Sequence, residues 1–244
     1  MRPERPSRKL HLLILLTGLM AWSANAAHAE PPLPLDLDDS RSSLVIGEEF
    51  ERDARWLDAI RHYEEALERW PEDDELKYGR RRSRVHFRIE RRYADQSFKA
   101  NLLGMSQSQA LELFDDTSRR IRGNFVESLS YLSLVAHGTE SFYIALADAK
   151  FLEANLPHAA TDQERNDRRE GLRDLRRVLR DDYWNKTIHN SQHARQMVLE
   201  VAQKAHQTLR IAPAAVIMEY VFGCCNSLDN YSGFLTADRL TDLY

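Results

Sequence analysis

Two histidines, His189 and His193, have a spacing that could support metal chemistry. Residues four apart lie on one face of a helix, where two imidazoles can share a zinc ion. However, Asn190 stands where a zinc-peptidase motif has its catalytic glutamate, and no nearby cysteine or carboxylate offers an obvious third ligand. We therefore predict no metal and no cofactor, and expect both histidines to be exposed at the start of a helix.

The serines and lysines do not form a recognisable nucleophile motif. No serine has the Gly-x-Ser-x-Gly context of a nucleophile elbow, and the chain has no glycine-rich phosphate-binding loop. Four lysines lack a serine partner in a matching motif: Lys99, Lys150, Lys186 and Lys204. We therefore predict that this chain contains no catalytic residue.

The composition predicts an all-α fold. The 244 residues are 43% hydrophobic, which is enough for one sizeable core or two modest ones. Only nine glycines and eight prolines are present. Leu, Ala, Arg and Glu, which favour helices, are frequent, so a turn-rich β architecture is disfavoured.

The N-terminus has the pattern of a secretory signal peptide. Basic residues precede an apolar run over residues 10–22, and two small-residue motifs, Ala24-Asn-Ala26 and Ala27-His-Ala29, offer cleavage sites. The run is shorter than the roughly 20 residues that a membrane-spanning helix needs. We predict a signal peptide over residues 1–29, export to the periplasm or cell envelope, and no stable membrane insertion after cleavage. An uncleaved anchor is the alternative.

Removal of this signal leaves an acidic chain. Four basic residues and one acid are lost, so that 30 Lys and Arg stand against 37 Asp and Glu, a formal charge of −7. An acidic surface is a poor binder of polyanions. We therefore predict no nucleic-acid partner.

The two cysteines, Cys224 and Cys225, are adjacent. Consecutive Cα atoms lie about 3.8 Å apart, which is closer than the usual disulfide range, and a helix turns neighbouring side chains about 100° away from each other. We expect two buried free thiols rather than a vicinal disulfide.

A helical hairpin is predicted after a proline-rich and acidic stretch, residues 30–43, which we interpret as an extended linker. From residue 44, small, aromatic and turn residues follow the spacing of a tetratricopeptide repeat: Ile46, Gly47, Phe50, Ala59, Ile60, Tyr63, Ala66, Leu67 and Pro71. Small residues let two helices approach, aromatic residues fill the wedge between them, and the proline ends the second helix. Ala54 stands where the turn usually has glycine.

Only one such repeat is recognisable, because arginines occupy the apolar positions of the next one. A lone repeat cannot bury its own apolar face, so this hairpin must dock on the helix after it and on the following domain. The hairpin either serves this packing alone or also offers a groove for a partner peptide. We assign residues 44–95 to the hairpin and the helix that follows it.

That helix, predicted over residues 73–95, carries a row of arginines. Its inner face is expected to contain Leu76, Val85, Phe87, Ile89 and Tyr93. The row consists of Arg80, Arg84, Arg88 and Arg92, and like charges four apart repel by a few tenths of a kcal/mol per pair. We expect the hairpin to present an acidic face to this row: Glu48, Glu49, Glu51, Asp58, Glu64, Glu65 and Glu68. An anionic partner is the alternative.

Residues 96–244 are predicted to form a second helical domain. A break around Gly104 marks its start, and Ser106 with Gln109 forms a capping box that opens the next helix. We therefore predict a domain boundary near residue 96.

Further helices are expected over residues 125–136 and 139–153, followed by a charged outer helix opened by Thr161 with Glu164. The helix after these has the clearest apolar stripe: Ala194, Met197, Val198, Val201, Ala202, Ala205 and Leu209. This stripe is expected to pack directly on the central helix of the protein.

The central helix is predicted over residues 213–225, where nearly every side is apolar. Its only charged residue is Glu219. Burial of an isolated carboxylate is costly, so Glu219 needs a partner or water.

A signature follows this helix directly. Leu228, Asp229, Tyr231, Ser232, Phe234, Leu235 and Thr236 resemble the segment that closes the helical N-terminal part of carboxyl-terminal processing (tail-specific) serine peptidases. Asn230 and Ala237 stand where that family frequently has proline. The stretch from Phe125 to Gly138 is similar to an earlier helix of the family, one that ends in glycine. The resemblance implies protein or peptide partners, a following PDZ and protease domain, and a catalytic serine and lysine beyond Tyr244.

Two hypotheses about function follow. In the first, the chain is the non-catalytic N-terminal region of an exported processing peptidase and has no peptidase activity by itself. In the second, it is a freestanding tetratricopeptide-like adapter of the cell envelope that holds a partner with its hairpin. An independent hydrolase finds no supporting residues.

Overall fold

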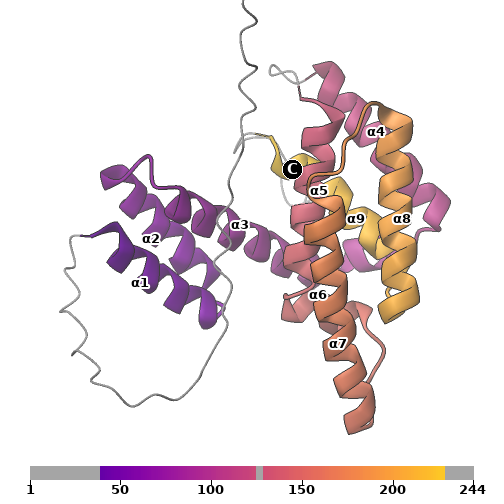
Figure 1. Ribbon diagram of the computed structural model, residues 1–244, viewed down its shortest axis with the longest axis horizontal. Helices are drawn as coiled ribbons and strands as arrows, with labels where there is room; N and C mark the ends of the chain where they lie inside the picture. Colours follow the sequence, from indigo (N-terminus) through magenta and orange to yellow (C-terminus); the bar gives the residue numbers. More distant parts are fainter. Residues whose placement is uncertain (1–38, 125–128, 229–244) are drawn as a thin grey trace, which may run out of the picture. The chain divides into compact units, whose positions relative to one another are not determined.

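The computed structural model describes residues 39–124 and 129–228, and within these residues it contains helices and no strand, which confirms the all-α prediction (Figure 1). The helices are α1 Ser40–Arg52, α2 Trp56–Arg69, α3 Asp74–Ala94, α4 Gln107–Asn124, α5 Tyr131–Ala145, α6 Ala149–Asn155, α7 Asp162–Val178, α8 Ser191–Leu209 and α9 Pro213–Asn226. Two π-helical turns, Phe98–Leu102 and Leu179–Tyr183, follow α3 and α7. The predicted signal peptide and most of the predicted linker lie outside the described residues.

The first core lies inside the hairpin of α1 and α2. Tyr63 is fully buried, and its ring fills the space between Gly47 on α1 and Gly79 on α3. A Cβ at Gly47 would lie 2.3 Å from this ring, and one at Gly79 would lie 2.5 Å from it. The hairpin therefore needs a second glycine, on the following helix, that the repeat pattern did not reveal.

The hairpin begins earlier than predicted. The side chain of Asp39 accepts a hydrogen bond from the backbone N–H of Arg41, 3.3 Å, and caps α1, so residues 40–43 of the predicted linker belong to this helix. Ser43 is buried, and its carbonyl oxygen accepts a hydrogen bond from His62 Nε2, 2.7 Å. Helix α2 therefore holds the extra turn through a polar contact. The spacing of apolar residues does not predict such a contact.

Ala54, in the turn between α1 and α2, has a left-handed backbone with φ of 55°. This conformation is costly for residues with a Cβ, so Ala54→Gly should raise the free energy of unfolding by about 1 kcal/mol. Urea denaturation measures the change. The matched control is Ala154→Gly on the exposed side of α6, which should lower stability by about 0.5–1 kcal/mol. Equal losses in both variants would contradict the turn described here.

Helix α3 belongs to both cores. Leu76 packs in the hairpin core, whereas Val85, Ile89 and Tyr93 pack in the larger core formed with the later helices, and Phe87 is half-buried. The same helix contacts α1 and α2 at one end and α5 and α6 further along. The boundary predicted near residue 96 therefore follows a helix that already joins the two parts.

The central helix α9 is buried along nearly its whole length. It packs against α4, α5 and α8 (Figure 1). The predicted apolar stripe of α8 is buried. The capping boxes predicted at Ser106 and Thr161 are both formed. Hydrophobic periodicity and capping chemistry thus predicted this part of the fold correctly.

The break predicted between residues 136 and 139 is wrong, because α5 continues through Gly138 to Ala145. Glycine is needed here for close packing. A Cβ at Gly138 would lie 2.3 Å from the ring of Tyr220, and one at Gly223 would lie 2.4 Å from the Cα of Gly138. The two helices therefore touch backbone to backbone.

Candidate interaction site

Most of the repeat-like residues form the interior of the hairpin. Ala59 and Tyr63 are fully buried, with 0% of their surface accessible, and Ala66 is also buried. Phe50 is half-buried, and Pro71 is exposed just after α2. The buried residues pack the hairpin, whereas Pro71 does not take the packing role predicted for it. Any partner must therefore contact the outer surface of α1 and α2.

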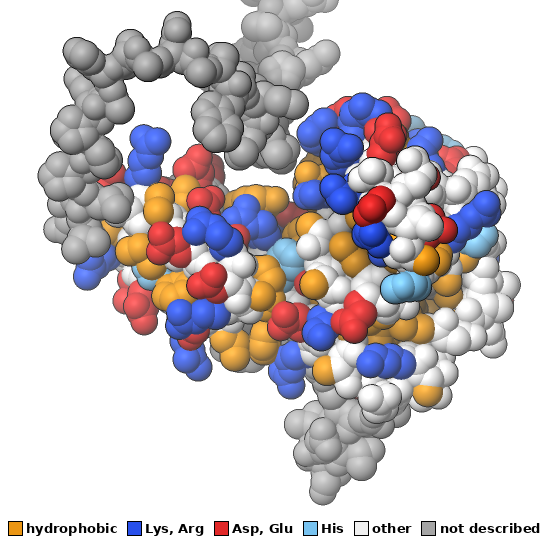
Figure 2. Space-filling model, turned by 90° about the horizontal axis from the view of Figure 1, so that it is seen from below, with side chains coloured by type: hydrophobic (Ala, Val, Ile, Leu, Met, Phe, Trp, Pro, Cys, Tyr) orange, Lys and Arg blue, Asp and Glu red, His pale blue; other side chains and the backbone are white. Residues whose placement is uncertain are grey.

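That outer surface carries two exposed aliphatic side chains. Val45 on α1 has 37% of its surface accessible and Leu57 on α2 has 46%. Figure 2 shows hydrophobic side chains among acidic and basic ones over the part formed by α1 to α3. Single exposed apolar residues are normal on soluble proteins, so these two define a candidate surface only together with the repeat-like hairpin that carries them.

Ion pairs between α3 and the hairpin fix the hairpin in place. Arg82 and Ser83 both donate to Glu51 on α1, with Arg82 Nε at 2.8 Å and Ser83 Oγ at 2.7 Å. Arg84 pairs with Glu64 on α2 at 2.5 Å. Two residues of the predicted acidic face are therefore engaged by α3.

Other polar side chains of α3 bond to the later part of the chain. Arg81 Nε donates to Glu140 Oε1 at 2.9 Å, and His86 Nδ1 lies 2.7 Å from Asp148 Oδ2. The His86 ring also stacks on Trp56 of α2, with centroids 4.1 Å apart and planes 5° apart. His86 thus joins the hairpin to the larger core through one side chain.

The most deeply buried polar group is Glu219 on the central helix. Arg92 Nη2 donates to both carboxylate oxygens, at 3.0 and 2.8 Å, and Ser141 Oγ donates to one of them at 3.0 Å. Burial raises the pKa of Glu219, while Arg92 and Ser141 oppose that rise. The predicted need for a partner is confirmed, and the arrangement is that of a structural ion pair closed to solvent.

The arginine row has more kinds of partner than predicted. Among the described ion pairs of this row, only that of Arg84 is with a carboxylate of the hairpin. Arg88 donates to Asn226 and Arg92 pairs with Glu219, both on α9. Burial and the neighbouring Arg84 lower the pKa of Arg80. The row therefore fastens α3 to two different elements.

The cysteines are poor nucleophiles in this environment. Both are free thiols; Cys224 is buried and Cys225 is half-buried. Burial raises the pKa of Cys224 above its ordinary range and that of Cys225 to about 11. The thiolate is the reactive form, so neither residue is prepared for nucleophilic attack near neutral pH.

His189 and His193 are both exposed at the start of α8, as expected. Asn190 is the N-cap of α8, with its side chain accepting from the N–H of His193 at 2.9 Å, so His189 lies before the helix. Both side chains are exposed, and their ring centroids are 5.4 Å apart. The described residues contain no group of three or more His, Cys, Asp or Glu that could hold a metal ion.

Of the peptidase-like signature, only Leu228 is described. It is half-buried and packs against the larger core just after α9. The other signature residues lie outside the described part of the chain: Asp229, Tyr231, Ser232, Phe234, Leu235 and Thr236.

Comparisons with known proteins give no relative. No family model, no curated protein and no solved structure matches the chain. Within the described residues, none of the helices has the length and apolar character to cross a membrane.

Proposed function

We propose that this chain is the non-catalytic helical region of an exported carboxyl-terminal processing serine peptidase. The observation that carries the proposal is the signature from Leu228 to Thr236, which begins two residues after the central helix ends at Asn226. In this proposal the region holds protein or peptide partners, and the catalytic serine and lysine belong to a following protease domain. The signal-peptide pattern of residues 1–29 supports export.

The described polar groups support a scaffold role for this region. Glu219 is closed inside the fold by Arg92, and Cys224 is buried with a raised pKa. The α1–α2 hairpin is tied to α3 by charged hydrogen bonds, so its outer surface is held on rigid helices. Rigid elements position recognition residues better than loops do.

A second candidate function is a freestanding envelope adapter. It is favoured by the completeness of the hairpin, in which Tyr63 is enclosed between two glycines while Val45 and Leu57 remain exposed. Such a hairpin requires no protease domain to hold a partner.

The reading frame beyond the codon for Tyr244 separates these two functions. The first proposal expects a glycine-rich strand, a PDZ domain and a Ser/Lys pair there. A stop codon directly after Tyr244, with no separate catalytic partner, would overturn it and support the adapter.

A further inference from the structure

Seven arginines lie on α7 and the π-helical turn after it, and they divide into two sets. Four bond to carboxylate or carbonyl oxygens: Arg165 with Asp162, Arg168 with the Pro157 carbonyl, Arg177 with Asp174, and Arg180 with Asp181. The other three, Arg169, Arg173 and Arg176, have no such acceptor within residues 39–124 and 129–228. We call these three the arginine stripe.

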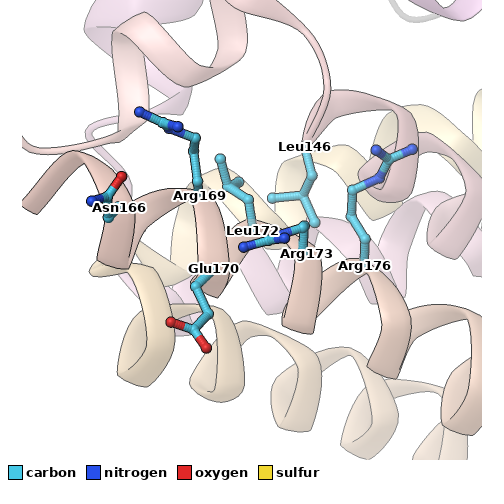
Figure 3. Close-up of a pocket in the computed structure, with 7 residues that line it drawn as sticks. All are labelled: Leu146, Asn166, Arg169, Glu170, Leu172, Arg173 and Arg176. Atoms are coloured by element: carbon cyan, nitrogen blue, oxygen red, sulfur yellow. The ribbon is translucent and has the colours of Figure 1, made fainter. Parts of the chain in front are cut away.

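The arginine stripe lies on one face of α7, because its residues follow each other at steps of four and three. It lines an open depression of about 530 Å³ together with Leu146, at the end of α5, and Leu172 (Figure 3). Along a helix axis, four residues advance about 6 Å and seven about 10 Å. The three guanidinium groups therefore extend along a line and do not surround one point.

The positive charge of this stripe is not balanced locally. Glu170 is the one acidic residue of the depression, and Figure 3 shows its carboxylate directed away from the guanidinium groups of Arg169 and Arg176. The Arg176 guanidinium lies over the Tyr143 ring, 4.3 Å from its centroid, and its Nε is buried without an acceptor. Like charges four apart on a helix destabilise it, and an unpaired buried donor adds a further cost. A bound anion would relieve the repulsion between the arginines.

We propose that the arginine stripe binds an extended acidic segment of a protein partner, with carboxylates on alternate residues. Alternate residues of an extended chain lie about 6.6–6.8 Å apart on one side, close to the roughly 6 Å between residues four apart on a helix. Guanidinium groups bind carboxylates through two parallel hydrogen bonds, which suits this pairing. A single phosphate ion is too compact to reach both ends of a stripe about 10 Å long. This site is separate from the hairpin and does not depend on the proposed peptidase assignment.

The test is a fluorescence-anisotropy titration of the full chain with a labelled peptide of alternating aspartate and serine. Replacing Arg169 and Arg173 together with glutamine should weaken binding about tenfold or more, because charged hydrogen bonds are lost. The matched control is Arg177→Gln with Arg180→Gln, which removes the same charge from α7 and the π-helical turn after it. These two arginines already have acidic partners, so binding should change by less than about threefold.

Two further probes make the result decisive. A peptide of the same composition with its aspartates contiguous should bind more weakly, and circular-dichroism melts should show that all variants fold. No measurable binding of the alternating peptide, or equal weakening in the stripe and control variants, would overturn the proposal. Tighter binding of single-stranded DNA with the same dependence on Arg169 and Arg173 would overturn it in favour of a nucleic-acid site.

Discussion

Replacement of Arg92 with methionine is expected to lower the free energy of unfolding by about 3–5 kcal/mol near neutral pH, because one partner of a buried ion pair is left uncompensated. Glu219 is fully buried and Arg92 is 6% exposed, so water cannot replace the lost guanidinium. Methionine keeps much of the apolar stem of Arg92 but lacks the guanidinium, which lies over the Phe222 ring, 4.1 Å from its centroid. Urea denaturation at constant pH measures the loss.

The size of this loss should depend on pH. Burial already raises the pKa of Glu219, and removal of Arg92 takes away the main influence that lowers it. The pKa of an unfolded Glu carboxyl is about 4.3. A carboxyl whose pKa is higher in the folded protein contributes stability at pH values below the unfolded pKa. This contribution is lost as the pH rises through the folded pKa. The deficit of Arg92→Met should therefore be smallest near pH 4, about the unfolded value, and grow toward neutrality.

A double variant provides the control. Arg92→Met with Glu219→Leu removes both charges, so it should recover most of the stability that the single change loses. A deficit independent of pH, or a double variant less stable than the single one, would contradict the role assigned to this pair.

The second large effect is expected at the contact of α5 and α9. Gly223→Ala should destabilise the protein by about 3 kcal/mol or more, at the upper end of overpacking effects. Its Cβ would lie 2.4 Å from the Cα of Gly138 and 2.5 Å from the carbonyl oxygen of His137. Both atoms belong to the backbone, so the two helices would have to separate. Thermal and urea denaturation measure this loss.

Gly123→Ala is the matched control, because it makes the same chemical change near the end of α4. Among the residues that the structure describes, none would lie within 4 Å of a Cβ there. Alanine favours helix over glycine, so this variant should be stabilised by up to about 1 kcal/mol. If both variants behaved alike, the close approach of α5 and α9 would be refuted.

Features with a local cause were predicted well from the sequence. The apolar stripe of α8 and the capping boxes at Ser106 and Thr161 are set by residues within a few positions of each other. The need of Glu219 for a partner followed from its apolar neighbours. The identity of that partner did not, because Arg92 lies 127 residues earlier in the chain.

The arginine row illustrates why partners were harder to predict than faces. Residues four apart on a helix advance about 40° around its axis, so Arg92 is turned about 120° from Arg80. A row that faces the hairpin at one end therefore faces α9 at the other. The sequence pattern suggested one acidic surface opposite the whole row. Because the row twists around α3, its arginines instead contact two different elements.

Glycine was the other source of error. A single sequence cannot tell a helix end from a close contact, and Gly138 serves the second purpose. The role of Gly79 beside Tyr63 was missed for the same reason. The arginine stripe of α7 has a recognisable sequence pattern, since Glu170 is the only acid three or four residues from any of its members.

The proposed function is that of a non-catalytic helical region that serves a processing peptidase. The most direct measurement compares two purified proteins, this chain and the product of the reading frame continued beyond Tyr244, for cleavage of an unstructured protein substrate. The account predicts that the longer product cleaves, that replacing its catalytic serine with alanine abolishes cleavage, and that this chain alone leaves the substrate intact. Cleavage by this chain alone, or a continued frame without peptidase activity, would contradict it.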